Sequence, residues 1–145
     1  MIWNGVMPAI TTCFDSSYAV DHRFMAEHCQ WLLDNGCTGL VPLGSLGEGA
    51  TLGFDEKLEI LATCVKAAQG KAPVVAAISS LKTSEAVDLA KAAADVGCDA
   101  LMVLPPYVYL GDWREMNRRR KMRGPPRSCW RGRADVSRPV CGPVE

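Results

Sequence analysis

The sequence predicts an α/β protein made of about four βα units of a parallel (β/α)8 barrel, followed by a disordered tail. Short apolar runs without polar alternation recur up to residue 104, which is typical of parallel strands buried on both faces. Segments with helical spacing of apolar residues separate these runs. The sequence DNGCTGLVPL at 34–43 also returns as DVGCDALMVL at 95–104. Repeated βα units of one length favour a barrel over a doubly wound sheet.

The elements follow one another in order. Four apolar runs are predicted to be strands: GVMPAIT at 5–11, GLVPL at 39–43, APVVAAI at 72–78 and ALMVL at 100–104. A helical pattern with a candidate N-cap follows each of the first three: Asp21 before 22–36, Asp55 before 56–70 and Thr83 before 84–97. Residues 111–116, GDWREM, resemble the opening of a fourth helix.

Helix 22–36 shows an apolar face by spacing. Its members are Phe24, Met25, His28, Trp31 and Leu32. We therefore expect His28 to be a packed core histidine and Trp31 to be a core or interface aromatic. His22, in the first turn, is expected in solvent.

The formal net charge of zero hides an uneven distribution. Residues 1–116 carry seven Lys/Arg and fourteen Asp/Glu, whereas residues 117–145 carry nine Lys/Arg and two Asp/Glu. The second segment is rich in Arg, Pro and Gly, and such a segment buries too little apolar surface to offset its ordering entropy. We expect it to be disordered, and our hypothesis is that residues 117–145 are read from a shifted frame, which would account for the abrupt change at Met116. The rival interpretation, a basic arm for nucleic acid, has only Trp130 as a stacking aromatic.

Composition excludes several classes of protein. No apolar run reaches the roughly 18 residues of a membrane span, and the N-terminus lacks the features of a signal peptide. A cytoplasmic protein without membrane or nucleic-acid partners is expected. The seven cysteines are scattered without a C-x-x-C pair, so they predict neither a metal site nor a disulfide framework.

The glycine-rich loop GSLGEGATL at 44–52 follows the second strand. In barrel folds, loops after the strands build the active site. Gly44, Gly47 and Gly49 allow backbone amides to converge and Ser45 adds a hydroxyl, which favours a cradle for a carboxylate or phosphate. A purely structural turn and a nucleotide phosphate cradle remain alternatives. The spacing G-x-x-G-x-G matches neither nucleotide motif.

Three blocks taken together resemble the dihydrodipicolinate synthase / N-acetylneuraminate lyase family over residues 5–116. They are GVMPAITTCFD, GCTGLVPLGSLGEGATL and GCDALMVLPPYVY, in that order. The resemblance implies a (β/α)8 barrel, homotetrameric in full-length members. It implies a lyase or aldolase that acts on pyruvate or a related 2-keto acid through a Schiff base, without a metal or organic cofactor.

The resemblance also implies roles for individual residues. The family loop Gly-[Thr/Ser]-Thr-Gly-Glu matches residues 44–48, so Gly44, the Ser45 hydroxyl and the Leu46 amide would bind the substrate carboxylate. Leu46 replaces the usual threonine, which weakens that grip or reshapes the pocket. Tyr107 matches a tyrosine after strand four and would form a proton relay with Ser45, or would only pack. Glu48 is expected to hold the loop by hydrogen bonds.

The family's fifth-strand tyrosine and sixth-strand Schiff-base lysine have no match in these 145 residues. The lysines of the regular region are predicted to be solvated: Lys57, Lys66, Lys71, Lys82 and Lys91. Lys82 lies nearest, after the third strand, but matches no catalytic position. We therefore expect a chain truncated before its lysine and inactive alone. The alternative is a non-catalytic half-barrel that serves as a binding or assembly module.

Overall fold

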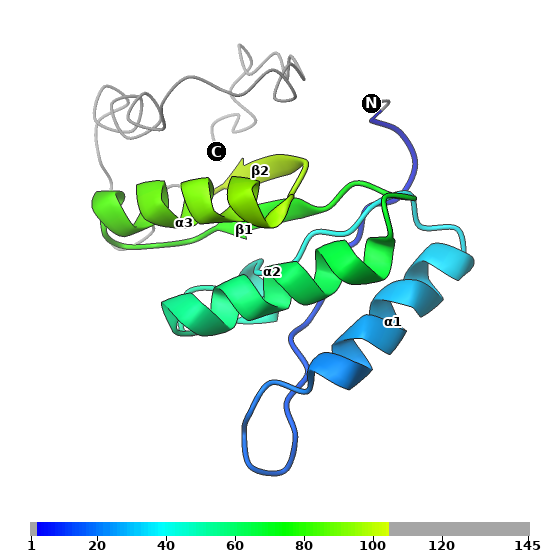
Figure 1. The fold of residues 1–145 in the computed structure, drawn as a ribbon, viewed down its shortest axis with the longest axis horizontal. Helices are drawn as coiled ribbons and strands as arrows, with labels where there is room; N and C mark the ends of the chain where they lie inside the picture. Colours follow the sequence, from blue (N-terminus) through cyan, green and yellow to red (C-terminus); the bar gives the residue numbers. More distant parts are fainter. Residues whose placement is uncertain (1–2, 105–145) are drawn as a thin grey trace, which may run out of the picture.

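A computed structural model describes residues 3–104 of the chain (Figure 1). Its elements, in chain order, are helix α1 (His22–Asp34), the 3-10 turn η1 (Ser45–Gly47), helix α2 (Phe54–Ala68), strand β1 (Val75–Ile78), helix α3 (Thr83–Val96) and strand β2 (Ala100–Val103). Among residues 3–104, none of the helices meets the length and hydropathy that a membrane span requires. The predicted fourth helix and the tail 117–145 lie outside the described residues.

The four predicted strand segments form one parallel sheet in sequence order. Strand β1 pairs in parallel with β2, and Val75 lies opposite Ala100. The first two segments are reduced to single parallel bridges, Ala9 to Val41 and Leu40 to Val74. Each of these segments contains a proline, Pro8 or Pro42, which lacks the N–H of one ladder bond. The order of parallel strands confirms the predicted fold class, part of a (β/α)8 barrel.

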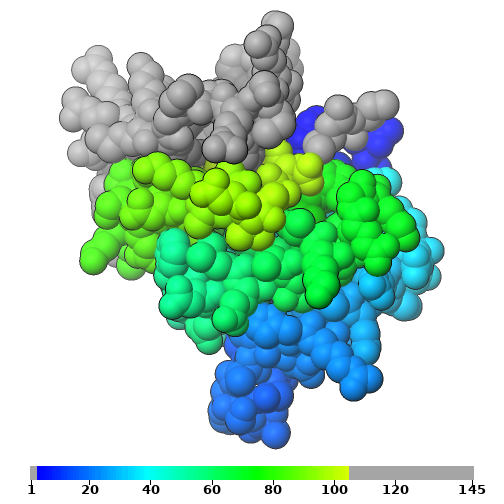
Figure 2. Space-filling model, viewed as in Figure 1, coloured from blue at the N-terminus to red at the C-terminus, as the bar shows by residue number. Residues whose placement is uncertain are grey.

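The three helices cover one side of this sheet, and the core lies between the two layers (Figure 1). In the space-filling view, α1, α2 and α3 follow one another as adjacent bands (Figure 2). The strand residues Leu40, Val74 and Ala76 are almost fully buried. Ile60 and Leu61 of α2 are fully buried, and each contributes about 1.5–3 kcal/mol to stability.

The internal repeat has the same backbone structure in both copies. Gly36 and Gly97 end their helices with φ of 93° and 104°, a left-handed conformation that favours glycine. The Cys37 amide then donates to the Leu32 carbonyl at 3.0 Å, and the Cys98 amide donates to the Ala93 carbonyl at 2.9 Å. These bonds satisfy helix-terminal carbonyls in the same way at both sites.

The residue after each of these cysteines binds the start of the preceding strand segment. The Thr38 amide donates to the Val6 carbonyl at 2.8 Å, and its hydroxyl donates to the Asn4 carbonyl at 2.6 Å. Asp99 donates its amide to the Val74 carbonyl and accepts the Val74 amide on its carboxylate, both at 2.9 Å. The repeat therefore joins the first segment to the second, and β1 to β2, at the amino ends of the strands.

The buried face of α1 differs from the predicted one. Met25 and Cys29 are buried, whereas Phe24 and Trp31 are 52% and 59% exposed. His28 is half-buried and stacks between these two rings, with centroids 6.3 Å apart on each side. The expectation of a core His28 is therefore wrong, and Trp31 is not a core residue. Its alternative role as an interface aromatic stays a prediction. The aromatic stripe lies one residue, about 100°, away from the stripe that faces the core.

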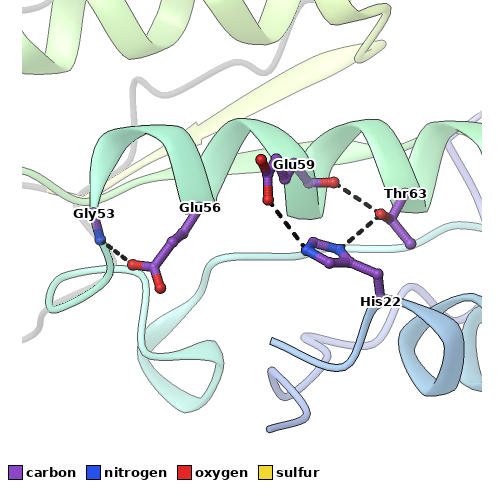
Figure 3. Close-up of polar contacts among 5 residues, drawn as sticks. All are labelled: His22, Gly53, Glu56, Glu59 and Thr63. Carbon is purple, nitrogen blue, oxygen red and sulfur yellow. Dashed lines mark hydrogen bonds and ion pairs between the residues drawn. The ribbon is translucent and has the colours of Figure 1, made fainter. Parts of the chain in front are cut away.

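His22 is also not a freely solvated side chain. Its Nδ1 lies 3.0 Å from the Thr63 hydroxyl and its Nε2 lies 3.3 Å from the Glu59 carboxylate (Figure 3). The Thr63 hydroxyl donates to the Glu59 carbonyl at 2.8 Å, so it accepts from His22 Nδ1. These contacts join the start of α1 to the middle of α2.

The predicted helix starts are correct for α1 and shifted for the others. Asp21 caps α1, since its carboxylate accepts the Phe24 amide at 2.9 Å. Helix α2 begins at Phe54, before the predicted cap Asp55, and the Gly53 amide donates to the Glu56 carboxylate at 2.7 Å (Figure 3). Helix α3 begins at the predicted cap Thr83 itself, because Lys82 is its N-cap residue.

Candidate functional site

The glycine-rich loop leaves the sheet through a strained residue. Leu43 is buried and has a φ of 64°, which is unfavourable for a side chain of this size. Glu48, at the end of η1, has a φ of 54°. Between them the chain makes the tight turn that the three glycines predicted.

Close packing against the rest of the protein explains two of the three glycines. A Cβ on Gly47 would lie 2.8 Å from the Ile10 carbonyl oxygen, and the Thr12 hydroxyl donates to the Gly47 carbonyl at 2.7 Å. A Cβ on Gly49 would clash with the Leu43 carbonyl oxygen. The loop is therefore fixed against the ends of the first two strand segments.

The amides of this loop divide into two groups. Those of Gly47 and Gly49 both donate to the Gly44 carbonyl, at 3.0 and 3.3 Å. They are not available to a ligand, so the expected convergence of all three glycine amides is not formed. Within residues 3–104, the Ser45 hydroxyl and the amides of Ser45 and Leu46 have no hydrogen-bond partner. Both residues are exposed. The donors open to an anion are therefore Ser45 and Leu46.

Glu48 holds the loop through its backbone and not through its carboxylate. Its carbonyl accepts the Thr51 amide and hydroxyl, both at 3.0 Å, and the Leu52 amide at 3.2 Å. In the described part of the chain, no group bonds to its exposed carboxylate. Glu48 therefore holds the loop by hydrogen bonds, as predicted, but through its backbone carbonyl and not through its side chain.

The loop after β1 adds polar side chains to the same rim. Because the strands are parallel, the loop 79–82 after β1 leaves from the same end of the sheet as the loop after Leu43. In this second loop the Ser80 hydroxyl donates to the Lys82 carbonyl at 3.2 Å. Tyr107 lies outside the described residues, so its relay with Ser45 stays a prediction.

One lysine differs from the expectation of solvated side chains. Lys57 on α2 is 2% exposed, and its Nζ lies 3.7 Å from the Glu85 carboxylate at the start of α3. The remaining lysines of the regular region are exposed: Lys66, Lys71, Lys82 and Lys91. Lys57 belongs to the buried stripe of α2 with Ile60, Leu61 and Cys64, a spacing that is visible in the sequence.

The described cysteines are free thiols, and a hydrogen bond between the buried Cys29 and Cys64 lowers the pKa of Cys29. The described cysteines are Cys13, Cys29, Cys37, Cys64 and Cys98. Burial raises the pKa of Cys98 to about 12. The pKa of Cys64 is also raised, by its hydrogen bond with Cys29 and by burial. Among residues 3–104, no group of three His, Cys, Asp or Glu side chains could hold a metal ion.

Comparisons with known proteins agree with this architecture. The sequence profile of the Dihydrodipicolinate synthetase family matches residues 3–121. The chain is 43% identical over 105 residues to a 4-hydroxy-tetrahydrodipicolinate synthase from Natronomonas pharaonis. That alignment covers 72% of this chain and 35% of the archaeal enzyme, so the chain spans about a third of its relative's length.

Solved structures show the same relationship. A dihydrodipicolinate synthase from Bacillus anthracis superimposes with a TM-score of 0.79 and 31% identity, over 85% of this chain and 42% of the bacterial one. The synthase from Acinetobacter baumannii, solved with pyruvate, superimposes with a TM-score of 0.78 and 27% identity, over 81% of this chain and 40% of its own. The order of strands, the repeated turns, the glycine-rich loop and these matches lead to one conclusion. The chain belongs to the dihydrodipicolinate synthase family.

Proposed function

We propose that residues 3–104 form the carboxylate-binding part of a site for pyruvate or a related 2-keto acid. One observation carries this proposal. The Ser45 hydroxyl and the backbone amides of Ser45 and Leu46 have no hydrogen-bond partner among the described residues, and both residues are exposed. Hydrogen bonds of this kind to a carboxylate are worth about 1.5–3 kcal/mol each. The pyruvate complex of the Acinetobacter baumannii relative supports the class of ligand.

We further propose that these 145 residues bind the acid without forming an imine. An imine requires a neutral lysine in a desolvated pocket. Lys57 is buried, but it faces Glu85 between two helices and not the rim that holds Ser45. Lys82 lies at that rim but is exposed.

The five free thiols of the described region support a reducing compartment, and we propose a cytoplasmic location.

Titration with pyruvate, followed by the backbone amide NMR signals, tests the binding proposal. We expect the Ser45 and Leu46 signals to shift most, and Ser45→Ala to weaken binding roughly tenfold, the loss of one hydrogen bond to a charged group. Ser16→Ala, in an exposed loop, is the matched control and leaves binding unchanged. Shifts that spread elsewhere and spare the loop would refute the carboxylate site.

Leu46 offers a test in the opposite direction. Leu46→Thr adds a second hydroxyl beside Ser45 at a side chain that is 72% exposed, so little packing is lost. We expect tighter pyruvate binding in the same titration. Borohydride treatment in the presence of pyruvate is expected to add no mass to the wild-type chain. A covalent adduct would contradict the non-catalytic part of the proposal and leave the carboxylate site standing.

A further inference from the structure

The sheet has two edges without a partner strand among residues 3–104. One edge is the first segment, residues 6–10, and the other is β2 with the adjoining Leu104. Unpaired edges of a parallel sheet expose rows of N–H and C=O groups that can pair with another chain. As far as residues 3–104 are concerned, both edges are open to pairing with a further parallel strand.

The hydrogen bonds of β2 show which groups its free edge presents. The Leu104 amide donates to the Ile78 carbonyl at 3.1 Å, so Leu104 is directed toward β1. Because backbone direction alternates along a strand, the amides and carbonyls of Leu101 and Val103 are directed toward the free edge.

The internal repeat leads to the same result independently. Leu101 and Val103 are equivalent to Leu40 and Pro42 in the earlier copy. The carbonyls of Leu40 and Pro42 accept the amides of the next strand, from Val75 at 2.8 Å and from Ala77 at 3.1 Å. The edge of β2 thus presents the acceptors that the second segment uses to bind its following strand.

The first segment presents the complementary groups. The Pro8 carbonyl accepts the Val41 amide at 3.0 Å, and the Ile10 amide donates to the Val41 carbonyl at 3.1 Å. By alternation, the amides of Met7 and Ala9 are directed away from the sheet. Ala9 pairs with Val41, and Ala77 pairs with Met102. Val41 and Met102 occupy the same position in the two copies of the repeat. Ala9 is therefore the counterpart of Ala77.

The face of the sheet opposite the helices is also incompletely covered. Paired positions place Ala9, Val41, Val75 and Ala100 in one row across all four segments. Ala9 is exposed, Val75 and Ala100 are half-buried, and Met102 in the next row is 40% exposed. In a closed barrel this face forms the packed interior.

We propose that two copies of this chain associate edge to edge and close an eight-stranded parallel barrel. The β2 edge of each copy pairs with residues 6–10 of the other, and the Val103 carbonyl accepts the Ala9 amide of the second copy. Residues 3–104 of each copy supply four of the eight strands that a barrel of this type requires. A second copy satisfies both edges at once, and two-fold symmetry makes the two junctions identical and closed. This assembly does not depend on the carboxylate site.

Analytical ultracentrifugation and native mass spectrometry of the full chain test the proposal. We expect a dimer of twice 15.7 kDa that dissociates on dilution. Ala9→Pro removes the outward amide without touching the bonds of Pro8 and Ile10 to Val41. We expect it to raise the dimer dissociation constant roughly tenfold or more, since both symmetric junctions lose a bond. Ala9→Ser keeps the amide and is the matched control.

A second pair of variants guards against loss of folding. Met102→Glu places a charge on the inner face and is expected to give a monomer. Ala62→Glu adds the same charge on the exposed face of α2 and is expected to leave the dimer intact. Circular dichroism verifies that each variant is helical.

Three outcomes would overturn the proposal. A folded monomer at all concentrations would show that no second copy is needed, and that residues 105–145 of the same chain pair with the edges. Open-ended larger species would show that the edges pair without closure. A dimer insensitive to both Ala9→Pro and Met102→Glu would place the interface elsewhere.

Discussion

At the scale of single residues, Lys57 shows how burial depends on which helical stripe faces the core. The chain places this lysine in line with Ile60, Leu61 and Cys64, and α2 carries all four to the interface with the rest of the protein. Residue type alone predicts a solvated lysine, because lysine is almost never fully buried unless paired. The partner, Glu85, comes from the first turn of α3, where a negative charge is also favoured by the helix dipole.

The Lys57–Glu85 pair predicts an asymmetry between its two partners. Glu85→Ala leaves a buried ammonium without its partner, so we expect a loss of about 1–3 kcal/mol, less than for a fully buried pair because Glu85 is partly exposed. Lys57→Met replaces the lysine by an apolar side chain of similar length and is expected to change stability by less than about 1 kcal/mol. Urea unfolding of both variants checks this. Asp88→Ala, exposed on α3, is the control. Equal losses for both partners would contradict the prediction.

The buried thiol of Cys98 predicts a loss of stability at alkaline pH. Its pKa is raised from 9.0 to about 12 by burial and by the neighbouring Asp99. Because the folded state resists ionisation, the stabilisation is fully present below about pH 9 and is lost as the pH rises toward 12. We expect Cys98→Ala to show a smaller alkaline loss than the wild type in unfolding experiments at successive pH values. Parallel pH profiles for the two proteins would contradict the assignment.

At the scale of elements, the sequence predicted the helices and strand segments more accurately than their ends. The Asp21 cap is confirmed because its geometry is local, one carboxylate and one amide three residues apart. The start of α2 was missed because Gly53 offers no capping side chain, and Glu56 supplies the bond from inside the helix. The stripe of α1 was misread by one residue because Phe24 and Trp31 are apolar but exposed.

The glycine-rich loop predicts different effects for two of its glycines. A Cβ at position 47 would meet a backbone carbonyl at 2.8 Å, whereas a Cβ at position 44 would meet the Ala9 Cβ at an ordinary 3.7 Å. Gly44 has a φ of −67°, which any residue adopts. We expect Gly47→Ala to destabilise the protein by about 1–3 kcal/mol and Gly44→Ala to be nearly neutral. Thermal melts compare the two. A large effect at Gly44 with none at Gly47 would contradict the packing described here.

At the scale of the whole molecule, the order of strands followed from the repeat and the apolar runs. The glycine-rich loop was predicted in part, because the sequence indicated a tight turn after the second strand but did not show which of its amides bond within the loop. That distinction depends on the Gly44 carbonyl, which accepts two amides of its own loop. Such bonds depend on backbone angles, including the positive φ of Leu43 and Glu48. The residue types at these positions do not predict those angles. Anion binding by residues 44–48 stays a prediction.

The exposed edges predict that folding and association are coupled. We expect the midpoint of thermal unfolding to rise with protein concentration, because a partner that binds only the folded chain stabilises it by mass action. Melts over about a hundredfold range of concentration, followed by circular dichroism, provide the measurement. A constant midpoint with a reversible transition would show that the chain is stable as a single copy.

The turns at Gly36 and Gly97 lie at the amino ends of the strands, whereas the loop that begins at Gly44 lies at the carboxyl ends. The bonds that link neighbouring units are thus separated in space from the glycine-rich loop. Substitutions in the exposed part of this loop leave the hydrogen bonds of Thr38 and Asp99 untouched, so the two ends of the sheet can vary independently of each other.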